Sequence, residues 1–255
     1  MTEQNRTHHA GPRHRLRRAA AVLAMSAVVA AGATACQVQP GAAAFVDNQR
    51  FTQTQVETIF DSIRDGYKGK LPSSQFANVR QAVTKDLVMR DLAKRVAEQK
   101  HLKVSPPDYK EISQQSGLPQ DNRYVRLEAQ TRSYVNAIRN GASPKKPSES
   151  DVREIYRSLV RSGVDPRRLP FDALRKGLPP GTGKAVAARD ELLDAAHKYH
   201  VDVNPRYGKL DYSLTAVSFQ DPSSGQMLVG SLTVPLGGGS PDVVHTAPAE
   251  NPLQG

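Results

Sequence analysis

Hydrophobic residues recur three and four positions apart over most of the chain, a spacing that places them on one face of a helix. The pattern predicts a mainly α fold. Thr52-Gln53-Thr54-Gln55 fits a capping box at the start of the first helix, because the Thr hydroxyl and the Gln side chain can satisfy free backbone N–H groups. Ser105-Pro106-Pro107-Asp108 predicts that the third helix opens with Pro at its first position. Helices are expected over 52–66, 74–99, 105–116, 121–140, 148–159, 171–176 and 184–199.

Other segments have the patterns of strands and chain ends. Ala43–Val46 is apolar and Val201–Val203 alternates, so each predicts a short strand. Leu214–Phe219 and Met227–Val234 are apolar runs separated by a polar loop, which favours a small β-hairpin. From residue 236 onward, Gly, Pro, Ser and small polar residues predict a disordered tail.

The first 36 residues are organised like an export signal. Met1–Arg18 is polar and basic, and Ala19–Ala35 is an uncharged run of mostly Ala and Val. This run is shorter than the ~20 residues that a membrane-spanning helix needs. Small residues precede the only cysteine of the chain, Cys36, as they precede the cleavage point of a secretory signal. Ala33-Thr34-Ala35-Cys36 resembles a lipobox, with Ala33 in place of the usual Leu, so we expect cleavage after Ala35 and a lipid on Cys36.

Two other interpretations of this segment remain open. It can be an ordinary secretory signal followed by an unmodified cysteine, or an anchor that is not cleaved. Lipidation accounts best for a lone cysteine in an exported chain, since no intramolecular disulfide is possible. The full chain has a net charge of +10, and removal of residues 1–35, with five Arg and one Glu, would leave +6, which suits solubility beside an anionic cell surface. We therefore expect a protein on the outer face of the cell membrane, with no nucleic-acid partner.

Several short segments follow one another in a fixed order: Ala44–Asn48 with Phe51, Thr52 and Val56, then Leu87–Leu92, Ala97, Leu102–Ser105, Ser148–Tyr156 and Asp202–Gly208. In this order, with a strand at each end of a set of helices, they resemble the N-terminal chaperone domain of SurA and of the PrsA and PpiD foldases, over roughly 43–208. The resemblance implies a multi-helix domain whose ends are joined by the pairing of two short strands, Phe45–Val46 and Val201–Val203.

The whole chain then has an expected order of parts. The helical domain lies between an N-terminal signal with a short tether and a C-terminal hairpin with a tail. These parts are the signal peptide 1–35, the tether 36–42, the SurA-like domain 43–208, the hairpin extension 209–235 and the tail 236–255.

Departures from this family argue against enzymatic activity. Its foldases usually carry a parvulin prolyl isomerase domain between the equivalents of Leu159 and Phe171, but here eleven residues separate the two. Even a small domain needs about 50 residues. Pro179–Lys184 is similar to a nucleotide-binding P-loop, yet Leu178 replaces the first Gly and Ala185 the Ser or Thr that would hold Mg²⁺. We expect no isomerase, no ATPase and no bound nucleotide.

The histidines do not predict a metal site. His197 and His200 lie three positions apart near a helix end, but no Glu or Cys at a suitable spacing completes a ligand set. Cationic side chains are favourable near a helix C-terminus in any case, because they interact with its dipole. We therefore expect no metal, no cofactor and no catalytic residue.

Two classes of function fit these expectations. One is a holdase-like chaperone that binds unfolded exported polypeptides between its helices, and the other is a module that docks one specific envelope protein. The candidate client-binding residues lie on the 121–140 helix, and the alternative is that they belong to the core. Burial of this helix and of 74–99 in one core would favour the single partner, whereas an open groove would favour chaperoning. The candidates are Tyr124, Leu127, Tyr134 and Val135.

Overall fold

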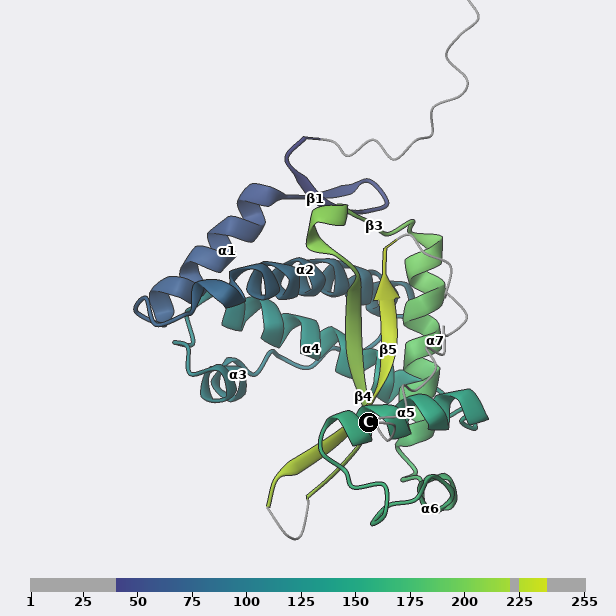
Figure 1. Cartoon of the computed structure of the whole chain (residues 1–255). Helices are drawn as coiled ribbons and strands as arrows, with labels where there is room; N and C mark the ends of the chain where they lie inside the picture. The colour runs from purple at the N-terminus through teal and green to yellow at the C-terminus, as the bar shows by residue number, and fades with distance from the viewer. Residues whose placement is uncertain (1–39, 221–224, 238–255) are drawn as a thin grey trace, which may run out of the picture. The chain divides into compact units, whose positions relative to one another are not determined.

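The computed structural model describes residues 40–220 and 225–237, which form seven α-helices and two small antiparallel sheets (Figure 1). The prediction of a mainly helical fold is therefore confirmed. The signal segment, Cys36 and most of the tail lie outside the described residues. The helices are α1 (Gln53–Gly66), α2 (Phe76–Gln99), α3 (Tyr109–Ser116), α4 (Arg123–Gly141), α5 (Glu149–Arg161), α6 (Phe171–Lys176) and α7 (Thr182–Lys198).

Side-chain caps set the starts of several helices. The capping box at α1 is confirmed, because Gln55 N–H donates to Thr52 Oγ1 at 3.1 Å and Thr52 N–H donates to Gln55 Oε1 at 2.8 Å. Ser148 and Asp151 form the same arrangement at α5. At α3 the expected Pro at the first position is wrong. Asp108 is the capping residue there and accepts a bond from Glu111 N–H at 2.8 Å, which leaves both prolines outside the helix.

A three-stranded sheet closes the helical region. The strands β1 (Ala42–Val46), β2 (Gln49–Thr52) and β3 (Asp202–Val203) lie in the order β2-β1-β3. Ala44 is opposite Val203 and Phe45 is opposite Asp202, so the pairing implied by the resemblance is confirmed. The strand β2 was not predicted, because its residues are mostly polar and continue directly into the capping box of α1.

The predicted C-terminal hairpin is also confirmed, and it is part of the core. It consists of β4 (Leu210–Gln220) and β5 (Met227–Leu236). Its inward side chains, such as Leu214 and Leu232, are buried among those of α2, α5 and α7. In Figure 1 the hairpin lies across α2 and beside α7. The exposed positions of β4 are polar, in alternation with its buried positions, whereas the outward positions of β5 also include Met227 and Val229.

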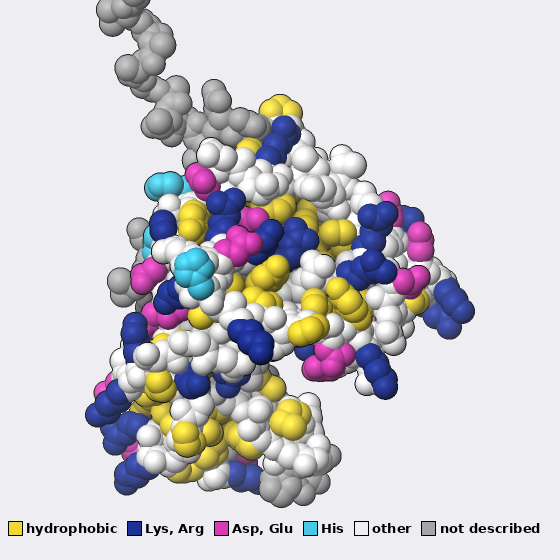
Figure 2. All heavy atoms as spheres, turned by 180° about the vertical axis from the view of Figure 1, so that it is seen from behind, with side chains coloured by type: hydrophobic (Ala, Val, Ile, Leu, Met, Phe, Trp, Pro, Cys, Tyr) yellow, Lys and Arg dark blue, Asp and Glu magenta, His cyan; other side chains and the backbone are white. Residues whose placement is uncertain are grey.

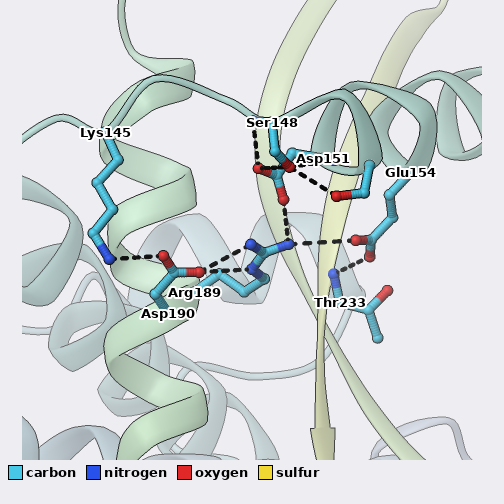
Figure 3. A network of polar contacts seen from close by, with 8 residues as sticks. Lys145, Ser148, Asp151, Glu154, Arg189, Asp190 and Thr233 are labelled. Carbon is cyan, nitrogen blue, oxygen red and sulfur yellow. Dashed lines mark hydrogen bonds and ion pairs between the residues drawn. The ribbon is translucent and has the colours of Figure 1, made fainter. Parts of the chain in front are cut away.

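One polar network joins the hairpin to the helices (Figure 3). Arg189 of α7 forms ion pairs with Asp151 of α5 at 2.7 Å and with Asp190 at 2.9 Å. It also lies 3.6 Å from Glu154, which accepts a hydrogen bond from Thr233 N–H of β5. A single guanidinium therefore connects α5, α7 and β5.

Candidate functional site

The four candidate client-binding residues of α4 contribute to the core. Leu127 and Val135 are each 3% exposed, and Tyr124 and Tyr134 are half-buried and pack against the same core. The apolar stripe of α2 is covered in the same way from Val83 to Val96. These two helices therefore present no continuous apolar face. A hollow of about 370 Å³ between α1 and α2 is lined by half-buried Val79 of α2 and Tyr124 of α4, and a larger apolar groove lies at the hairpin.

An apolar groove of about 660 Å³ lies where the tip of the hairpin meets the chain between α5 and α7. We call it the tip groove. Buried Val164, Leu174 and Leu228 form much of its lining, and half-buried Leu169 and Phe219 add to it. Figure 2 shows hydrophobic side chains gathered on the lower part of the molecule, in the region of α6 and the hairpin tip.

Local contacts hold the α5–α6 connection in place. Gly163 turns the chain after α5 with a φ of 110°, a conformation that L side chains rarely adopt. Asp165 Oδ1 accepts a bond from Arg167 N–H at 2.9 Å, and the rings of Tyr156 and Phe171 pack edge to face at 5.6 Å. The groove is thus formed by the connection between α5 and α7 together with the tip of the hairpin.

The segment that borders this groove is rich in basic residues, and Asp165 and Arg168 of this segment line the groove itself. Residues 161–177 contain five Arg or Lys and two acids, all of them exposed. One of the two acids, Asp172, pairs with Arg175 at 3.1 Å. The apolar lining of the groove suits a partner segment with apolar side chains. The basic residues of 161–177 favour acidic residues next to that segment.

A second groove, of about 600 Å³, lies between α4 and β4 and is polar. We call it the α4–β4 groove. Asp86 of α2 lines it although the residue is only 2% exposed. Burial raises the pKa of Asp86 well above its ordinary value, and the nearby charge of Glu128 raises it further. Burial likewise raises the pKa of Tyr124 and Tyr212, which line the same groove.

The sequence contains a signal for the burial of Asp86, which was not among the predicted site residues. Asp86 lies three positions after Val83, within the apolar stripe of α2, so an inward-facing acid was predictable. Tyr212 and the residues of the tip groove carry no comparable motif. They come from segments far apart in the sequence that only the packing of the hairpin brings together.

The P-loop-like segment is an ordinary helix start. Thr182 N–H donates to Pro179 O at 3.0 Å and Ala185 N–H donates to Gly181 O at 3.2 Å. Gly183 packs against the chain between α4 and α5, and a Cβ there would lie 2.7 Å from Lys145 O. His197 and His200 lie at and just beyond the end of α7. Across residues 40–220 and 225–237, no three His, Cys, Asp or Glu side chains are grouped as metal ligands.

No helix in the described part of the chain is both long enough and apolar enough to cross a membrane. Comparison with known proteins finds no match to a family model, to a curated protein or to a solved structure.

Proposed function

We propose that the chain is an exported, lipid-anchored protein that binds a short apolar segment of another polypeptide in the tip groove and catalyses no reaction. The carrying observation is that this groove, of about 660 Å³, brings half-buried Leu169 and Phe219 together with buried Val164, Leu174 and Leu228 around one apolar hollow. Its basic surroundings favour a segment with acidic neighbours. The export signal ending at Cys36 would place the partner among exported or envelope proteins.

The resemblance to the SurA-type chaperone domain supports a polypeptide ligand. The segments that carry the resemblance lie in β1, α2, α5 and β3, and the implied pairing of β1 with β3 is present. We infer that the domain keeps the polypeptide-binding role of this family without the isomerase. Its binding surface would then be the short connection between α5 and α7, together with the hairpin tip.

Between the two classes of function, we propose the docking of one specific partner rather than a general holdase. A chaperone for many clients needs broad apolar surface that remains open after folding. Here the stripes of α2 and α4 are buried, and the tip groove has room for only a few side chains. A holdase that accepts few clients is the second candidate, and the family resemblance favours it.

A binding experiment separates these possibilities. The mature chain, produced with Cys36→Ser, is mixed with several unrelated unfolding proteins, and their aggregation is followed by light scattering. It is also immobilised to capture envelope proteins from the cells that produce it. Suppression of aggregation for several proteins would establish a holdase, whereas selective capture of one protein without such suppression would establish the docking module.

Variants then locate the binding surface. Phe219→Ser and Leu169→Ser should weaken binding, because they remove apolar area from the tip groove. Tyr134→Ser is the matched control, since this half-buried residue lines a different hollow beside Arg90 and Pro106. Loss of binding in the Tyr134 variant alone would assign the function to the face of α4 and refute the tip groove. Prolyl isomerase or ATPase turnover above background, abolished by a point change, would refute the absence of catalysis.

A further inference from the structure

The two edges of the hairpin differ in what covers them. The sheet has two strands, so each strand has one edge without a neighbouring strand. On the edge of β5, Val229 N–H donates to Ser162 Oγ at 3.3 Å and Thr233 N–H donates to Glu154 Oε1 at 2.5 Å, both acceptors lying beside or on α5. Pro235 on the same edge has no N–H to donate. The edge of β5 is therefore closed by α5 and by proline.

The register identifies the corresponding groups on β4. Opposite residues of an antiparallel pair either bond to each other or both point their backbone groups away, and the two cases alternate along the strand. Thr233 points its N–H away from β4 and lies opposite Ser213, and Ser231 lies opposite Thr215. Ser213 and Thr215 therefore direct their N–H and C=O groups to the free edge. Within the described ranges, no hydrogen bond engages these groups.

This edge also lacks the usual protection against strand pairing. Free edges in natural proteins commonly carry Lys, Pro or a bulge, which prevent another chain from adding as a strand. From Leu210 to Thr215, β4 has none of these, and the irregularity in register begins only between Thr215 and Val217. Asp211 is the single charged residue of the strand.

The free edge borders a groove with room for a polypeptide segment. Tyr212–Thr215 form one side of the α4–β4 groove, which has a volume of about 600 Å³. The other side is a polar face of α4, where Tyr124, Glu128 and Arg132 follow one another at intervals of four residues. Because four consecutive residues of β4 border the groove, its edge and not only one face is open to it.

The charge of the groove indicates the side chains that a bound segment would carry. The acids are largely engaged: Glu128 and Glu111 lie 2.7 Å and 3.7 Å from Arg132, and Asp108 caps α3. Burial favours the uncharged form of Asp86 by raising its pKa. Three further cations line the groove and form no ion pair within residues 40–220 and 225–237: Lys85, Lys103 and Arg139.

We propose that the free edge of β4 is a strand-addition site that takes an extended, acidic segment of a partner polypeptide. The segment forms a third strand beside Ser213 and Thr215, and its acidic side chains pair with Lys85, Lys103 and Arg139. Backbone hydrogen bonds supply the affinity in this mode of recognition, and the side chains select the partner. The site is separate from the tip groove and extends the proposed function to a second contact with a polypeptide.

A designed peptide tests this site directly. The probe is a synthetic peptide of alternating Val and Glu, about eight residues long, which covers the edge at ~3.3 Å per residue. Its binding to the Cys36→Ser mature chain is measured by fluorescence anisotropy, and NMR-detected amide exchange is measured with and without the peptide. Two further peptides carry the same side chains with N-methylated amides along one edge, or Lys in place of Glu.

We expect the Val–Glu peptide to slow amide exchange at Ser213 and Thr215. The N-methylated peptide should bind about ten-fold more weakly, because it loses backbone donors, and the Lys peptide should also bind more weakly. In the protein, Ser213→Pro should weaken binding by a similar factor, whereas Ser213→Ala keeps the N–H and should not. If Ser213→Pro fails to fold, the two altered peptides still decide the outcome.

Three results would overturn the proposal. The first is equal affinity for the parent and the N-methylated peptide. The second is unchanged binding by a folded Ser213→Pro variant. The third is slow exchange at Ser213 and Thr215 in the dilute protein without peptide, because another part of the chain would then cover the edge. Phe219→Ser should leave peptide binding at β4 intact, so that failure of the tip groove and failure of this site are distinguishable.

Discussion

Gly230 offers a sharp test of how firmly the hairpin belongs to the core. This residue of β5 lies directly against α5, and a Cβ at this position would lie 2.7 Å from Val217 Cγ2, 2.8 Å from Ile155 Cγ2 and 2.9 Å from Leu159 Cγ. All three distances are shorter than van der Waals contact. Gly230→Ala must therefore push β5 away from α5 or force several core side chains to shift.

The magnitude follows from two opposing effects. Overpacking a well-packed core typically costs 1–3 kcal/mol, whereas replacing Gly by Ala in a strand gains about 0.5–1 kcal/mol of conformational free energy. Three simultaneous contacts with branched side chains place the packing cost at the upper end. We expect the free energy of unfolding to fall by about 2 kcal/mol. The melting temperature should fall by about 4–8 °C, since a domain of this size loses about 2–4 °C per kcal/mol.

Chemical and thermal denaturation measure this loss, with Ser231→Ala as the control. Ser231 is the next residue of the same strand, is half-exposed on the opposite face, and should tolerate Ala with little change. In Gly230→Ala, amide exchange should accelerate in β5, α5 and α7 together, because they share one core. A variant as stable as the parent, or acceleration confined to the hairpin, would refute the conclusion that the hairpin is an integral part of the core.

Three further predictions concern the anchor, the buried acid and the polar network. Cys36→Ser should release the protein from membranes or leave an unprocessed precursor, and a variant that fractionates and migrates like the parent would exclude lipidation. Because folding raises the pKa of Asp86, the contribution of Asp86 to stability should be fully present below its unfolded pKa and be lost as pH rises through the raised pKa, and Asp86→Asn should remove this contribution to the pH dependence in denaturation at several pH values. Arg189→Met leaves Asp151, whose side chain is 6% exposed, without its cation and should cost about 2–3 kcal/mol, below the full range for a buried pair because Ser148 still bonds to Asp151. Lys145→Ala removes only an exposed partner of Asp190 and is the control in the same unfolding measurement.

Local features of the fold were predictable because their causes are local. The capping residues Thr52 and Ser148 and the helical stripes depend on neighbours within a few positions, and the structure has them at the expected places. The correction at Asp108 is also local, because a side-chain acceptor three residues before Glu111 outweighs the preference of Pro for the first turn. The pairing of β1 with β3 joins distant segments, and it could be expected only from the family resemblance.

The binding surface was not predictable, because an apolar stripe shows that a face is covered and not what covers it. Leu127 and Val135 have the same spacing whether a client or the chain itself packs against α4. Here the chain's own core buries them. The tip groove gives no sequence signal, since Leu169 and Phe219 become neighbours only through tertiary packing.

The packing of the hairpin gives a physical reason for placing the proposed binding sites along β4 and not between α2 and α4. The hairpin's inward residues, including Leu210, Leu214 and Leu232, are buried in the core beside α2 and α7, so that no apolar groove is open to a client there. The same two strands create new surfaces where the packing ends: Val217–Phe219 border the tip groove, and Tyr212–Thr215 border the α4–β4 groove. Both proposed sites thus lie along consecutive parts of β4. A partner that used both sites would need an apolar segment at one end of the strand and an acidic, extended segment at the other. That requirement is far more selective than the recognition of unfolded chains in general, and it gives a physical reason to expect one partner rather than many.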